Sequence, residues 1–119
     1  MASTLSLPAQ LPSLGFDPTK QICDAVTRKP TAAARILENL KKIFADGTVT
    51  QKFPLSVAYI NQQSTQLLAG GDSCRFFFNG LVTPFQTDLQ NNKQNVQNAQ
   101  QKLIQYIIGK FPQIMGLLG

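Results

Sequence analysis

The sequence predicts an all-α fold, a compact bundle of four to five amphipathic helices closed by one disulfide. Apolar residues recur at helical spacing in several stretches, and no stretch alternates apolar and polar residues as a half-buried strand would. Asp17-Pro18, Pro54 and Thr83-Pro84 are typical helix starts, because proline in the first turn gives up no hydrogen bond. At 119 residues, the chain is long enough for a single core.

Proline and serine recur without a period over residues 1–16, where we expect an extended N-terminal arm. The remaining residues, 17–119, are then a single helical domain. We expect its first helix over residues 18–29, capped by Asp17 and stopped by Pro30.

The second helix is expected over residues 31–46, with Gly47 as a left-handed cap. Its apolar residues fall on one stripe: Ile36, Leu37, Leu40, Ile43 and Phe44. A third helix should run from Pro54 to the Gly70-Gly71 pair. It is expected to place Val57, Ile60, Leu67 and Leu68 inward.

The run Phe76-Phe77-Phe78 is expected to form a short helix. Thr83-Pro84 then starts the longest helix, which should reach about Ile108 before Gly109 and Pro112 break it. A heptad-like seam marks that helix: Phe85, Leu89, Asn92, Val96, Ala99, Leu103 and Tyr106. The side chains expected in the core are Ile36, Leu40, Phe44, Ile60, Leu67, Phe85, Val96 and Leu103.

Two cysteines, Cys23 and Cys74, are the whole cysteine content. A disulfide between them would close a loop of about 50 residues, which stabilises a fold by about 4 kcal/mol in the chain-entropy model. The alternative is a pair of buried thiols in a cytosolic protein. We prefer the disulfide, and with it a mature secreted chain whose leader has been removed.

The charge balance allows two interpretations, a merely solvated basic face and a basic face that binds a partner. The formal net charge is +5, and seven of the eleven cations lie between Lys20 and Lys52. We do not expect nucleic acid as a partner, because no arginine-rich run exists and the phenylalanine run is not interleaved with cations. Histidine is absent and the six carboxylates are scattered singly, so we expect no enzyme, cofactor or metal site. No apolar stretch is long enough to span a membrane.

The aromatic residues allow two interpretations. Three adjacent rings on a helix cover most of its circumference, so at least one ring must face another element or a cavity. Packing in the core is the simpler interpretation. The alternative is a carrier whose cavity binds a small apolar ligand, with candidate lining residues Phe76, Phe77, Phe78, Phe85 and Tyr106.

The size, the Cys23 and Cys74 pair, the basic first half and the amide-rich long helix together resemble the small helical proteins of arthropod saliva, in particular the mosquito anophensin/albicin type. This resemblance implies a protein that inhibits a host coagulation or complement complex by binding and without catalysis. It carries no functional residue over to this chain.

We therefore predict a secreted, non-enzymatic binding protein that inhibits an extracellular protein target by steric occlusion. The residues predicted to contact the partner are the cations of the first two helices: Arg28, Lys29, Arg35, Lys41 and Lys42. The alternatives are the apolar-ligand carrier and a structural or surface-active secreted protein. The second alternative is suggested by a charged fraction of only 14% and by abundant glutamine and asparagine.

Overall fold

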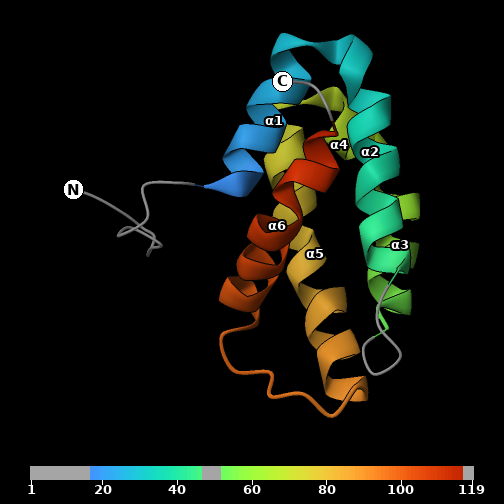
Figure 1. The fold of residues 1–119 in the computed structure, drawn as a ribbon, viewed down its shortest axis with the longest axis vertical. Coiled ribbons are helices and arrows are strands. Elements are labelled where there is room, and N and C mark those ends of the chain that lie inside the picture. Colours follow the sequence, from blue (N-terminus) through green and yellow to red (C-terminus); the bar gives the residue numbers. More distant parts are fainter. Residues whose placement is uncertain (1–16, 47–51, 117–119) are drawn as a thin grey trace, which may run out of the picture.

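Six helices and no strands make up the part of the chain described by the computed structural model, residues 17–46 and 52–116 (Figure 1). The predicted all-α fold with one disulfide is confirmed. The predicted arm over residues 1–16 and the predicted cap at Gly47 lie outside the described residues. The helices are α1 (Pro18–Arg28), α2 (Pro30–Ala45), α3 (Pro54–Gln62), α4 (Ser64–Ala69), α5 (Gly71–Asn91) and α6 (Ala99–Met115).

The bounds of the first two helices lie within one residue of those predicted. Asp17 caps α1, since its Oδ1 atom accepts hydrogen bonds from the backbone N–H groups of Thr19 and Lys20 at 3.1 and 3.2 Å. Pro30 begins α2 immediately after the turn at Lys29. The apolar stripe of α2 is buried as predicted, with Ile36, Leu40 and Phe44 completely inaccessible to solvent.

The predicted third helix is divided into two, α3 and α4, at Gln63. Every residue from position 61 to 66 is polar, so no apolar side chain anchors this stretch to the core. After the change of direction Leu67 is buried, whereas Leu68 is 39% exposed and not inward as expected. Gly70 then allows the turn into α5, with a φ of +72° that suits glycine.

The helix start predicted at Thr83-Pro84 is wrong, because α5 runs through both residues and also contains the phenylalanine run. An interior proline costs about 3 kcal/mol relative to alanine. Burial on both sides of Pro84 outweighs this cost, since each large apolar side chain contributes about 1.5–3 kcal/mol. The buried positions of α5 recur at helical spacing over its whole length: Cys74, Phe77, Phe78, Leu81, Phe85, Asp88 and Leu89.

The predicted longest helix is interrupted between α5 and α6 by the linker 92–98. Lys93 and Asn98 adopt positive φ values of 61° and 57° there, a region that asparagine tolerates better than most residues. The expected break at Gly109 is also wrong. Helix α6 continues through Gly109 and Pro112 to Met115.

Seven of the eight side chains predicted for the core are buried, and Val96 is the exception. Val96 is half-buried because it lies in the linker 92–98 and packs against the edge of the core. Helix α2 packs against α1, α3, α4 and α6. Its ring contact with α5 is made by Phe44, whose centroid lies 6.1 Å from that of Phe85.

Cys23 on α1 and Cys74 on α5 form the predicted disulfide, with Cα atoms 5.6 Å apart. Close to it, the Thr27 hydroxyl accepts a hydrogen bond from the backbone N–H of Gly71, the first residue of α5, at 3.0 Å. Helix α1 is therefore joined to the first turn of α5 by a covalent bond from its middle and by a hydrogen bond from its last turn.

Helices α3 and α5 approach each other closely at Gly80. The Tyr59 hydroxyl donates a hydrogen bond of 2.8 Å to the carbonyl oxygen of Phe77. A Cβ atom at Gly80 would lie only 2.2 Å from the Tyr59 hydroxyl oxygen. This position therefore excludes any side chain as long as Tyr59 keeps its hydrogen bond.

Candidate functional site

The cations predicted to bind a partner all lie on α1 and α2, and they differ in their surroundings. Arg28, Lys29, Arg35 and Lys42 are exposed. Lys41 is half-buried, and its Nζ atom forms an ion pair of 2.8 Å with Glu38. The charge of Lys41 is thus offset locally, whereas neither ion pair found among the described residues includes the four exposed cations.

The structure divides these four exposed cations into two groups. Arg28 and Lys29 lie at the corner between α1 and α2, whereas Lys42 lies in the last turn of α2. At about 1.5 Å of rise per residue, Lys29 and Lys42 are about 20 Å apart along the helix. Arg35 and Lys42 are seven residues apart and share one side of α2, because seven residues make almost two full turns.

The side of α2 that carries Arg35 and Lys42 borders α6. The Asn39 side-chain Nδ2 donates a hydrogen bond of 3.1 Å to the carbonyl oxygen of Ile114, near the end of α6. A Cβ atom at Gly116 would lie 3.9 Å from the Arg35 Cδ atom, which places the arginine stem beside the same helix end.

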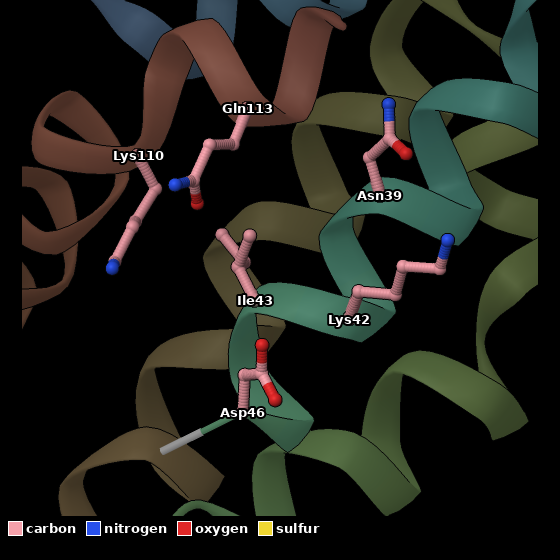
Figure 2. A pocket seen from close by; sticks show the side chains of 6 residues that line it. All are labelled: Asn39, Lys42, Ile43, Asp46, Lys110 and Gln113. Carbon is pink, nitrogen blue, oxygen red and sulfur yellow. The ribbon is translucent and has the colours of Figure 1, made fainter. Parts of the chain in front are cut away.

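A polar groove of about 310 Å³ lies between α2 and α6 (Figure 2). We call it the α2–α6 groove. Lys42 and Lys110 extend away from each other on either side of Ile43, and the Gln113 side chain extends from α6 toward Ile43. The residues that line the groove are Asn39, Lys42, Ile43, Asp46, Lys110 and Gln113.

Tyr106 joins the two helices next to this groove. Its hydroxyl donates a hydrogen bond of 2.6 Å to the carbonyl oxygen of Ile43. Burial of the ring, and secondarily the negative charge of Asp46, raise the pKa of the Tyr106 hydroxyl above its ordinary value. The hydroxyl therefore stays a hydrogen-bond donor at neutral pH. The Lys110 Nζ atom lies 6.0 Å from the centre of the Tyr106 ring, at the outer limit of a cation–π contact.

Sequence reasoning assigned only Lys42 among the groove residues. The missed residues on α6, Lys110 and Gln113, are three positions apart and therefore share a polar face of that helix. That spacing is enough to predict a solvent-exposed polar face on α6. Whether this face lies opposite Asn39 and Asp46 of α2 depends on how the two helices pack, which their sequences do not specify.

The candidate lining residues of an apolar cavity lie in different surroundings. Phe76 is 65% exposed on the outside of α5, whereas Phe77 and Phe78 are buried and pack edge to face at 5.1 Å between centroids. Phe85 and Tyr106 belong to a cluster of four rings from different parts of the chain. All six pairs in this cluster have centroids 5.0–6.2 Å apart, the spacing of rings in direct contact; its members are Phe44, Phe53, Phe85 and Tyr106.

Within residues 17–46 and 52–116, no group of three or more histidine, cysteine or carboxylate side chains is placed to hold a metal ion. None of the helices in this part of the chain is long and apolar enough to cross a membrane. Comparisons with protein-family models, curated proteins and solved structures find no match to this chain.

Proposed function

We propose that this protein is a secreted, non-enzymatic binding protein that occludes a protein partner with its basic surface on α1 and α2. The observation that carries the proposal is the position of Arg35 and Lys42. Both are exposed, both lie on the side of α2 that borders α6, and neither takes part in an ion pair among the described residues. Exposed charges of this kind steer the encounter of two proteins and help to select the partner.

The extracellular part of the proposal is supported by the disulfide. Bonds of this kind form and persist in oxidising compartments and are rare in the cytosol. Cys23 and Cys74 are both buried, so the bond is shielded from solvent thiols. In its most specific form, the proposal is that the target is a host plasma protein. This part is supported by the resemblance to salivary inhibitors.

The carrier alternative has no comparable support. It requires rings that line a space, whereas Phe77, Phe78 and Phe85 pack against other rings of the core. A surface-active role would be favoured by a broad exposed apolar face. In the described part of the chain, the exposed large apolar side chains are Leu55, Leu68 and Phe76.

Affinity capture from extracellular fluid of the natural source tests the proposal. The wild-type protein should capture a protein that R35Q/K42Q captures more slowly at low salt, because rim charges act mainly on the association rate. The matched control is R75Q/K93Q, which also removes two exposed cations but from α5 and the linker 92–98. Equal capture by all three proteins would contradict the proposal. A lipid that co-purifies with the native protein in native mass spectrometry, with no protein captured, would favour the carrier.

A further inference from the structure

We propose that the α2–α6 groove binds an extended acidic segment of the partner protein that also carries a basic residue next to its carboxylates. This inference rests on the proposed function and names the chemistry that the binding surface recognises. The groove combines two lysines on its rims with an uncharged amide and one carboxylate.

The cations of the groove are placed to hold carboxylates on both sides of an extended chain. Lys42 on α2 and Lys110 on α6 lie on opposite sides of Ile43 (Figure 2). Alternate side chains of an extended segment point in opposite directions. Successive carboxylates of such a segment can therefore reach the two lysines in turn.

Gln113 provides a hydrogen-bonding group within the groove. No hydrogen bond of its side-chain amide is formed with the described part of the chain, and the side chain extends toward Ile43 (Figure 2). An amide offers both a donor and an acceptor. It can thus bind the backbone of an extended segment, whose N–H and C=O groups are unpaired.

Asp46 gives the groove one anionic end. This carboxylate lies at the C-terminal end of α2, beyond Lys42 and Ile43. It favours a lysine or arginine of the partner at this end. It also repels a nucleic-acid strand, which carries a negative charge on every phosphate, and none of the lining residues is an aromatic ring on which a base could stack. The groove is therefore suited to a peptide of mixed charge and unsuited to a polyanion.

The walls of the groove are fixed before any partner arrives. Asn39 bonds the Ile114 carbonyl and Tyr106 bonds the Ile43 carbonyl, so hydrogen bonds join α2 and α6 at two separate points. A preformed site loses less conformational entropy on binding than one that must be ordered.

Fluorescence anisotropy with labelled probes tests this inference at low salt. The probes are a peptide of four glutamates followed by a lysine, the same peptide with a fifth glutamate in place of the lysine, and a ten-nucleotide oligothymidylate. The mixed peptide should bind the wild-type protein most tightly. K42Q/K110Q should weaken its binding by about fivefold, since each exposed ion pair contributes modestly, while R75Q/K93Q should leave it within about twofold.

D46N gives the sharpest readout. Loss of this carboxylate should remove the preference for the mixed peptide over the all-glutamate peptide, because the lysine of the probe then has no anion to pair with. All of these substitutions replace exposed or groove-lining side chains, and unchanged melting curves should show that each variant is folded.

Three results would overturn the inference. They are equal weakening by R75Q/K93Q, tighter binding of the oligonucleotide than of both peptides, and an unchanged peptide preference in D46N. If one of these results appears while R35Q/K42Q still slows capture of the natural partner, the groove inference is contradicted and the proposed function is not. If R35Q/K42Q also leaves that capture unchanged, the groove inference and the proposed function are both contradicted.

Discussion

At the scale of single residues, Asp88 is a buried carboxylate that hydrogen bonds hold in place. Its side chain is only 1% exposed, yet it comes from α5 and caps a different helix, α3. One carboxylate oxygen accepts the backbone N–H of Leu55 at 3.1 Å, and the other accepts both the N–H and the hydroxyl of Ser56 at 2.8 Å. These bonds compensate the loss of hydration and satisfy N–H groups that the first turn of a helix leaves unpaired.

Asp88→Ala should lower the free energy of unfolding by about 2–4 kcal/mol, because it leaves the buried N–H of Ser56 and the partly buried N–H of Leu55 without an acceptor. Urea denaturation followed by circular dichroism measures this change. Asp72→Ala, which removes an exposed carboxylate from the first turn of the same helix, is the matched control and should change stability by less than about 1 kcal/mol. A urea midpoint for Asp88→Ala equal to that of the control would contradict the assigned cap.

At the scale of elements, α5 shows that burial can override the local signal for a helix start at Pro84. Pro84 has no N–H to donate to the Gly80 carbonyl four residues earlier, so the helix lacks one hydrogen bond at this point. The two halves nevertheless share one buried face, with Leu81 before the proline and Phe85 after it. Separate helices would have to expose part of that face.

Pro84→Ala should therefore raise the free energy of unfolding by about 1–2 kcal/mol. Alanine restores the missing hydrogen bond, and the gain exceeds the entropy that the unfolded chain recovers when proline is removed. Thermal unfolding followed by circular dichroism should show a higher melting temperature. If Pro84 instead opened a separate helix, the substitution would be neutral or destabilising, because proline is favourable at a first helical position.

At the scale of the whole molecule, the disulfide ties the first helix to the fifth across a sequence separation of 51 residues. Helix α1 also packs against α2, α4 and α6, so the bond constrains a helix at the centre of several contacts.

The double substitution Cys23→Ala/Cys74→Ala should lower the free energy of unfolding by about 4 kcal/mol, the chain-entropy estimate for a loop of this length. Urea denaturation of the oxidised wild type and the variant gives the difference. The wild type in the presence of reductant serves as a second measurement, and non-reducing peptide mapping verifies the bond itself. Recovery of both cysteines as free thiols from the native protein would refute the pairing and remove the main support for an extracellular location.

The sequence alone determined the class of the fold, most of its core and its covalent link. Helical spacing of apolar residues is a local property, so the stripes of α2 and the cap at Asp17 could be predicted without knowledge of neighbours. With only two cysteines, Cys23–Cys74 was the one disulfide that the chain could form within itself, and the structure confirms it over a pair of buried thiols.

Only the tertiary structure decided where the long helices end and which polar groups meet. Pro84, Gly109 and Pro112 are helix breakers by local preference, and burial of residues on either side of each overrides that preference. The linker 92–98 interrupts an apparent heptad seam because α6 must reverse direction to pack against α2 and α5. For the same reason the sequence could not predict the α2–α6 groove: Lys42 and Lys110 line it from two helices whose relative placement depends on the whole core.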